Sequence, residues 1–244
     1  MNVEFDSYAT TYSDLLSDPI RDRFASNSRY FHERKWALIE DFLASQNAPL
    51  ADSSWLDVGC GQGELLDFGR AYFARAAGCD PSAKMLESHL GKETYAQPSP
   101  TELPFPDESF DLVTAVCVYH HVHGVDRTLL TEAICRVLKP GGTFCIIEHN
   151  PWNPITREIV KRCPVDIDAE LIGVGDAERI LTSAGLNVID RRFFLYLPQR
   201  LYRVASWIEH CLAKVPLGGQ FALFGRKPMS RSSSFGMKED TIAA

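Results

Sequence analysis

Two histidine-rich stretches supply the side chains best suited to moving protons. The segment "YHHVH" contains His120 and His121, and the segment "EHN" contains His149. A histidine has an unperturbed pKa of about 6.5, so it can take a proton from a hydroxyl near neutral pH. Adjacent side chains point in different directions, so we expect at most one of His120 and His121 to face a site. We predict a catalytic base among these three histidines; the alternative is a structural place in a pocket wall.

The same histidines must also be considered as ligands of a zinc ion. Cys117 precedes His120, His121 and His123 closely enough for all four to be considered as ligands. Their spacing matches none of the common patterns of zinc-binding proteins. We therefore predict no metal ligands in this chain.

A glycine-rich turn in the stretch "WLDVGCGQGELL" indicates a site for a nucleotide-like ligand. Gly59, Gly61 and Gly63 stand between an apolar run and a helix-forming run. Glycine tolerates positive φ and lets a ligand approach the backbone. The dinucleotide fingerprint needs a further glycine where Glu64 stands, and a carboxylate there would repel a pyrophosphate. The spacing thus disfavours a nicotinamide dehydrogenase and suits a ribose joined to a zwitterionic amino acid.

These residues require a scaffold, and strands alternate with helices along most of the chain. Because parallel strands are joined by crossover helices, this alternation predicts an α/β fold: a doubly wound, Rossmann-like, mostly parallel seven-stranded sheet with helices on both faces. The last two strands enclose an insertion, which predicts an antiparallel C-terminal strand. We expect strands over 54–59, 75–80, 93–97, 110–116, 143–150, 187–198 and 218–228, and helices over 24–43, 64–74, 82–90, 126–142, 175–186 and 200–215.

Composition narrows the class of protein further. The chain has 244 residues, of which 45% are hydrophobic, and a formal net charge of −7, which disfavours nucleic acid as the main partner. Seven cysteines without a C-x-x-C pair indicate a reducing, cytoplasmic setting. No signal peptide or membrane-spanning stretch is expected. We divide the chain into a helical cap (1–50), a main domain (51–228) with insertions at about 151–173 and 198–216, and a disordered tail (229–244).

Four motifs, in this order, resemble those of the class I S-adenosylmethionine-dependent methyltransferases of the type 11 kind. "LDVGCGQGELL" resembles their first motif, and "GCDPSAKML" resembles their second strand with its terminal acid. "LPFPDESFDLVTAVCVYHHV" and "AICRVLKPGGTFCIIE" resemble the segments through their fourth and fifth strands. The agreement in order and spacing over four motifs is more specific than the glycines alone.

The resemblance implies S-adenosyl-L-methionine as the cofactor and assigns residues to it. Asp57 and the backbone of residues 59–63 would face its methionine part, and Asp80 would accept hydrogen bonds from the ribose hydroxyls. Met85 and Leu103 would enclose the adenine, and Cys117 would line the sulfonium region. The implied cofactor-binding residues are Tyr8, Asp57, Gly59, Cys60, Gly61, Gly63, Asp80, Pro81, Met85, Leu103 and Cys117.

The implied activity is methyl transfer to a small molecule, with oxygen preferred because of the histidines. Two alternatives remain: an acceptor linked to a lipid or saccharide, and a non-catalytic module that only binds the cofactor. Two basic clusters suit an anionic acceptor: Arg157, Lys161 and Arg162, and Arg191, Arg192, Arg200 and Arg203. The nearby residues Phe193, Phe194, Leu195, Tyr196 and Trp207 suit a lipid-linked acceptor at a membrane surface. A solvated basic face explains the same clusters. The oligomeric state is left open by the sequence.

Overall fold

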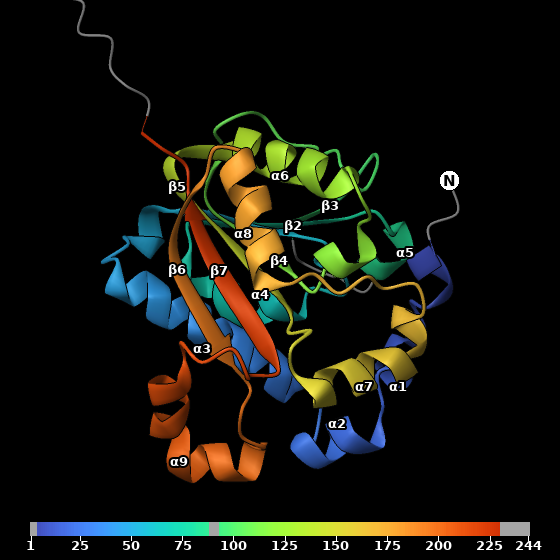
Figure 1. Cartoon of the computed structure of the whole chain (residues 1–244). Coiled ribbons are helices and arrows are strands. Elements are labelled where there is room, and N and C mark those ends of the chain that lie inside the picture. Colours follow the sequence, from blue (N-terminus) through green and yellow to red (C-terminus); the bar gives the residue numbers. More distant parts are fainter. Residues whose placement is uncertain (1–3, 88–92, 230–244) are drawn as a thin grey trace, which may run out of the picture.

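A single seven-stranded β-sheet forms the centre of the computed structural model, which describes residues 4–87 and 93–229 (Figure 1). The strand order is β3-β2-β1-β4-β5-β7-β6. The first five strands pair in parallel, whereas β7 is antiparallel to both β5 and β6. The predicted fold class, including the antiparallel C-terminal strand, is confirmed. The strands are β1 Ser54–Val58, β2 Arg75–Asp80, β3 Glu93–Ala96, β4 Phe110–Val116, β5 Leu138–His149, β6 Asn187–Phe194 and β7 Gln220–Arg226.

Helices cover both faces of this sheet, as the alternating pattern predicted. The α-helices are α1 Tyr12–Leu15, α2 Pro19–Phe24, α3 Arg29–Ser45, α4 Glu64–Gly69, α5 Ala83–Leu86, α6 Asp126–Val137, α7 Pro154–Arg162, α8 Val174–Ser183 and α9 Gln199–Leu212. Short 3-10 turns lie at η1 Glu4–Ser7, η2 Leu50–Asp52, η3 Arg70–Tyr72, η4 Tyr119–His121 and η5 Pro164–Asp166. Figure 1 shows α6 and α8 on one side of the sheet and α3 on the other.

Side chains alternate along the strands and so build two hydrophobic cores. In β5, Phe144 and Ile146 join the core beneath α6 and α8, whereas Cys145 and Ile147 join the core beneath α3 and α4. The same alternation follows from the pleat of any strand buried on both faces. The two cores together hold the sheet rigid, so the carboxyl ends of its parallel strands form a fixed platform.

The predicted helices differ from the structure in their bounds, and packing or the backbone explains the difference for three of them. The segment 24–43 is divided, because Ala25 is extended and separates α2 from α3. The segment 64–74 is helical only to Gly69, where a Cβ would lie 2.3 Å from the Trp36 ring, so close packing explains this glycine. The segment 126–142 is helical only to Val137, because Leu138 is extended and begins β5.

Some predictions fall outside the described residues. The end of the helix expected over 82–90 and, apart from Met229, the tail expected over 229–244 lie there. Within residues 4–87 and 93–229, no helix combines the length and apolar character needed to cross a membrane.

Candidate active site

The glycine-rich loop of residues 59–63 joins β1 to α4 through an unusual backbone bend. Gly59, Gly61 and Gly63 have φ values of +66°, +52° and +68°, a region that side chains disfavour. A Cβ at Gly59 would lie 2.5 Å from the Val118 side chain, whereas one at Gly61 would meet nothing closer than Met85 at 3.7 Å. The loop therefore needs glycine for its bend, and at Gly61 it leaves space above the backbone.

Asp80, at the end of β2, holds this loop in place. Its carboxylate accepts a hydrogen bond from the backbone N–H of Gly61 at 2.9 Å and another from that of Ser82 at 2.8 Å. The N–H of Cys60 donates to the carbonyl of Cys79 at 3.0 Å, which ties the loop to β2 a second time. A carboxylate can accept about four hydrogen bonds, so one group suits both the loop and a ligand.

Asp57, in β1, is a second acid beneath the loop. It is buried, and its Oδ1 accepts a hydrogen bond from the Thr114 hydroxyl at 2.6 Å. The Trp55 indole N–H donates to the same hydroxyl at 2.9 Å, which fixes its orientation. Burial raises the pKa of Asp57 to about 7, despite the hydrogen bond from Thr114. An ammonium group bound nearby would favour the charged form of this carboxyl.

A cavity of about 540 Å³ opens above the carboxyl ends of β1, β2, β4 and β5. This is where ligands bind in doubly wound sheets, and the volume suits a small molecule. Tyr8, Gly63 and Leu103 do not line it; Leu103 is buried in the core beneath α6. The predicted residues that line it are Asp57, Gly59, Cys60, Gly61, Asp80, Pro81, Met85, Cys117, His120, His121 and His149.

The N-terminal segment of residues 4–24 lies across this cavity and is fastened to the loops around it. Asp6 accepts a hydrogen bond from the Ser82 hydroxyl at 2.5 Å, and Gln62 donates to the carbonyl of Ala9 at 2.8 Å. On the far side, Arg162 of α7 pairs with Asp18, the N-cap of α2, at 2.9 Å. Figure 1 shows α1, α2 and α7 gathered on this side of the molecule.

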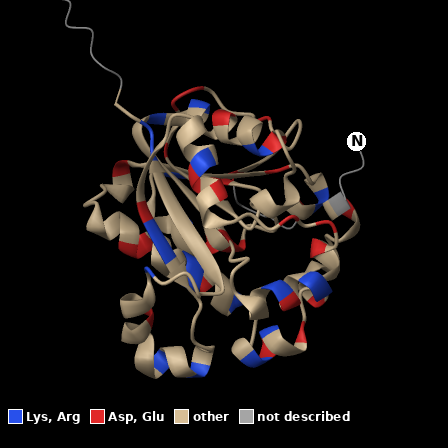
Figure 2. Cartoon of the chain, in the orientation of Figure 1, with Lys and Arg blue, Asp and Glu red and all other residues tan. Residues whose placement is uncertain are grey.

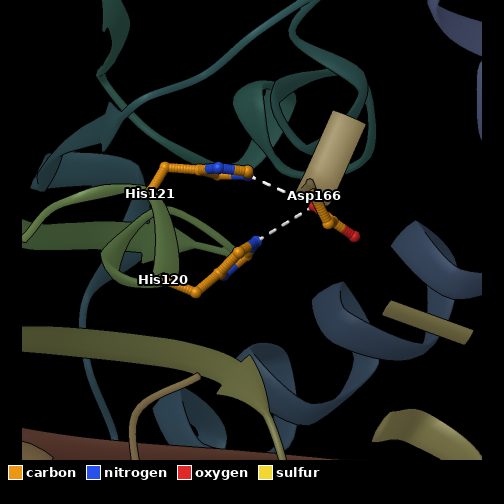
Figure 3. Close-up of side chains that lie close together, drawn as sticks. All are labelled: His120, His121 and Asp166. Carbon is orange, nitrogen blue, oxygen red and sulfur yellow. Dashed lines mark ion pairs between the residues drawn. The ribbon is translucent and has the colours of Figure 1, made fainter. Parts of the chain in front are cut away.

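His120 and His121 both reach one carboxylate, that of Asp166 in η5 (Figure 3). The distances from their Nε2 atoms to Asp166 Oδ1 are 3.5 Å and 3.4 Å. The other ring nitrogen of His120 donates to Glu148 Oε2 at 2.6 Å. The expectation that at most one of the adjacent histidines would face the site is wrong, because the η4 turn directs both toward the cavity.

The charges within this histidine cluster follow from its geometry. Burial opposes a charged His120, but the negative charge of Glu148 and the hydrogen bonds to Asp166 and Glu148 raise its pKa to about 10. Burial would raise the pKa of Asp166, yet hydrogen bonds from both histidines hold it well below its ordinary value. Burial and the nearby His120 charge lower the pKa of His121. At neutral pH the cluster is thus a His120 cation between two carboxylates, beside a neutral His121.

The same cluster bears on the zinc question. The ligand atoms of His120, His121 and Asp166 lie within 4.8 Å of one another, a spacing that suits a shared proton or a shared cation. A metal ion bound here would require His120 to give up one of its ring protons. The set considered from the sequence does not assemble, because His123 faces Glu170 instead, at 3.3 Å.

Cys117 is the centre of a second polar group, at the end of β4. Its sulfur accepts hydrogen bonds from the Lys35 ammonium at 3.3 Å and from the Gln220 amide at 3.4 Å. The same amide nitrogen lies 3.4 Å from Nδ1 of His149. Burial would raise the pKa of this thiol, but the positive charge of Lys35 and the interaction with His149 lower it to about 6. Cys117 therefore carries thiolate character at neutral pH, which is unusual for a partly buried cysteine.

Sequence reasoning missed several cavity residues and misplaced the basic ones. Lys35, His32, Arg21 and Asp166 line the cavity, although they come from three segments with no shared motif. The basic side chains of the predicted cluster, Arg157, Lys161 and Arg162, do not line it, and Arg162 is engaged by Asp18 and Glu158. Figure 2 shows basic and acidic residues mixed around α7. The helical spacing of residues 24–43 was the only signal that could have pointed to Lys35.

Comparisons with known proteins support one family. Residues 56–146 match the model of a methyltransferase domain. The chain is similar to the ubiquinone/menaquinone biosynthesis C-methyltransferase UbiE of Vibrio vulnificus, with 33% identity covering 64% of this chain and 70% of the relative. It is also 31% identical to the uncharacterized methyltransferase YcgJ of Bacillus subtilis and to the demethylmenaquinone methyltransferase of Symbiobacterium thermophilum. Those matches cover 56% and 60% of this chain, and span 58% and 62% of the two relatives.

Solved structures share the fold. A SAM-dependent methyltransferase from Archaeoglobus fulgidus matches with a TM-score of 0.59 and 17% identity, covering 82% of this chain and all of that one. At this identity the likeness concerns the fold alone, whereas the UbiE relative is matched closely over most of its length. The chain belongs to the class I S-adenosylmethionine-dependent methyltransferases, a family whose cofactor is S-adenosylmethionine.

Proposed function

We propose that the protein transfers a methyl group from S-adenosylmethionine to a small-molecule acceptor held in the cavity. The observation that carries this proposal is the loop of residues 59–63, bent by three glycines and fastened by Asp80 at the cavity's edge. Around this loop the cavity presents backbone groups and the carboxylates of Asp57 and Asp80 to its ligand, whereas Lys35 and Arg21 line the part formed by α2 and α3. These backbone groups and hydrogen-bond-accepting carboxylates suit a ribose and a positively charged amino acid.

The cofactor residues follow from the resemblance and from their places in the cavity. Asp57 and the loop backbone would hold the methionine part, including its ammonium group, and Asp80 would hold the ribose. Pro81 and Met85 line the cavity beside Asp80 and would contact the adenine. Tyr8, Gly63 and Leu103 do not line the cavity. Their contact with the cofactor therefore stays a prediction.

The protein's main task in methyl transfer is positioning. When bound, S-adenosylmethionine supplies a methyl group activated by a positively charged sulfur leaving group. The platform of strand ends would hold the acceptor in line with that group, and the N-terminal segment would exclude water. Cys117 and His149, at the ends of β4 and β5, would border the point of transfer. No metal is required for this chemistry.

The pKa directions of His120 and His121 separate these two histidines by role. A neutral His121 can take a proton from a hydroxyl, whereas a protonated His120 cannot. We therefore propose His121, or His149 across the cavity, as the base, and His120 as a positioning residue that holds Asp166. A neutral base supports oxygen as the methylated atom. The UbiE relative is named a C-methyltransferase, so carbon is the second candidate.

Labelled cofactor tests this function directly. The protein is incubated with S-adenosylmethionine carrying a deuterated methyl group and with metabolite extract, and products are identified by mass spectrometry. The proposal predicts new products heavier by one labelled methyl, which the Asp80→Ala variant forms more slowly at a cofactor concentration below the Kd of the wild type. Cofactor binding by calorimetry without any labelled product would indicate a non-catalytic binding module, and absence of both would contradict the proposal.

A lipid-linked acceptor at a membrane surface is a second candidate, supported by α9. Leu201, Val204 and Trp207 on this helix are at least half exposed, at 53%, 79% and 65%. Arg200 and Arg203 are interspersed with them, a pattern suited to anionic lipid surfaces. Sedimentation with anionic vesicles, comparing the wild type with Trp207→Ser, tests this candidate. Equal, negligible binding by both would exclude it.

A further inference from the structure

Lys35 is a buried cation whose partner is a thiol instead of a carboxylate. Its residue is 6% exposed, and its ammonium donates to Cys117 at 3.3 Å. Among the described residues, no carboxylate oxygen lies within the 4.0 Å ion-pair distance of Lys35. A buried ammonium is costly unless it is paired with an anion. Lys35 therefore lacks the carboxylate partner that such a group usually has.

Unsatisfied polar atoms lie beside Lys35 in the same cavity wall. Gln220, which is 5% exposed, has a buried Oε1 with no hydrogen-bond partner. His32 lies one turn before Lys35 on α3, and its buried Nδ1 also has none. Burial, Lys35 and Arg21 together lower the pKa of His32 to about 3, so the ring is neutral and can donate or accept. Both residues line the cavity.

Carboxylates line both parts of the cavity, whereas the lysine and the arginine among its described lining residues lie in one part. Asp57, Glu64 and Asp80 line the part around the glycine loop, and Lys35 and Arg21 line the part formed by α2 and α3, where Asp18 is engaged as the N-cap of α2 and by Arg162. Arg21 stacks over the Phe31 ring at 4.6 Å and donates to the carbonyl of Leu16 at 2.8 Å. The apolar residues that line this second part are Leu15, Leu16, Phe24, Phe31, Ile155, Ile159 and Val160.

We propose that Lys35 anchors the acceptor, and that the acceptor is an apolar small molecule bound through an oxyanion, either a carboxylate or an ionised acidic hydroxyl. The cation would bind that oxyanion, the His32 ring N–H would donate a further hydrogen bond to it, and the apolar wall would hold the body of the molecule. The Oε1 of Gln220 only accepts hydrogen bonds, so it would face a donor group of the acceptor and not the oxyanion. This inference rests on the proposed function, because it seats the acceptor beside Cys117.

The state of Cys117 without acceptor agrees with this assignment. Lys35 and His149 favour its thiolate, so the sulfur supplies the negative charge that Lys35 otherwise lacks. An arriving oxyanion would take over the ammonium, so the pKa of Cys117 would rise and its thiolate would take up a proton from water to become a neutral thiol. Anion binding should therefore protect Cys117 from alkylation.

Simple aromatic probes test the anchor without knowledge of the natural acceptor. Binding of 4-hydroxybenzoate and of its neutral isostere 4-hydroxybenzamide is measured by calorimetry with S-adenosylhomocysteine present. We expect the wild type to prefer the anion by about 10- to 100-fold and Lys35→Met to lose that preference. Lys35→Arg should retain it, as should the control Lys161→Met, which alters an exposed lysine of α7 outside the cavity.

Three results would overturn the anchor. They are equal binding of the two probes by the wild type, an unchanged preference in Lys35→Met, and loss of S-adenosylhomocysteine binding in Lys35→Met. Failure of the wild type to bind S-adenosylhomocysteine would instead contradict the proposed function. Should Lys35→Met fail to fold, iodoacetamide labelling of wild-type Cys117 decides: the benzoate must slow it more than the benzamide, and equal rates contradict the anchor.

Discussion

The two parts of the cavity are built in different ways. The cofactor part comes from one continuous stretch, in which β1, the glycine loop and the end of β2 lie within about 30 residues, and its chemistry depends largely on the backbone. The acceptor part is assembled from α2, α3, α7, η5 and β7, which lie far apart in the sequence. Its chemistry depends on side chains that only the folded chain brings together. The cofactor part therefore depends on a local stretch of sequence, whereas the acceptor part depends on the fold of the whole chain.

The largest expected effect concerns proton transfer in the acceptor part. His121→Ala should lower kcat by about 100- to 10,000-fold, because a positioned base contributes this much, while the cofactor Kd stays within about twofold. Steady-state kinetics and calorimetry measure the two quantities. His123→Ala is the matched control, since His123 does not line the cavity. Full activity in His121→Ala, and likewise in His120→Ala and His149→Ala, would mean that no histidine is the base.

The next largest effect is expected from a substitution in the glycine loop, which should weaken cofactor binding. Gly59→Ala should weaken cofactor binding by about 2–3 kcal/mol, roughly 30- to 150-fold in Kd, because it combines positive φ with contact against Val118. Gly124→Ala has a similar φ of +53° and no neighbour within 4 Å, so it controls for strain alone. Equal cofactor affinity of the two variants in calorimetry would remove the loop from the site.

Replacement of Asp80 should weaken cofactor binding by a similar or smaller amount. Asp80→Ala removes a charged acceptor, and we expect cofactor affinity to fall by about 1–3 kcal/mol. Asp107→Ala is the control, because that side chain is 73% exposed and pairs with Arg136 away from the cavity. Cofactor affinity that is unchanged in Asp80→Ala would exclude Asp80 from the site.

The smallest effect is a shift in the titration of Cys117. A thiolate forms as pH rises through the pKa, so alkylation of Cys117 should increase with a midpoint near pH 6. Burial and Glu148 on β5 raise this pKa, whereas Lys35 on α3 and His149 on β5 lower it by more. Lys35→Met should move the midpoint up, toward the ordinary thiol value of about 8.5. The pH dependence is followed by mass spectrometry of the Cys117 peptide, and a wild-type midpoint near 8.5 would contradict the assigned ion pair.

The difference between the two parts also explains what the sequence could predict. The sheet, its antiparallel last strand and the glycine loop follow from hydrophobic period and glycine spacing, which are local. Helix ends were less predictable. The helix that ends at Gly69 packs against Trp36 there, and the helix before Leu138 ends because β5 begins at that residue. Asp166 and Lys35 carry no local signature, since their roles arise only when η5 and α3 meet the strand ends. Because Lys35 has no local signature, the sequence analysis assigned anion binding to the exposed basic residues of α7 instead.

Calorimetric titration of S-adenosylmethionine into three proteins tests the division of the cavity most directly. The wild type should bind one equivalent per chain, Asp80→Ala should bind more weakly, and Lys35→Met should bind as tightly as the wild type. No binding by the wild type, or equal losses in both variants, would contradict a cofactor part and an acceptor part that are chemically distinct.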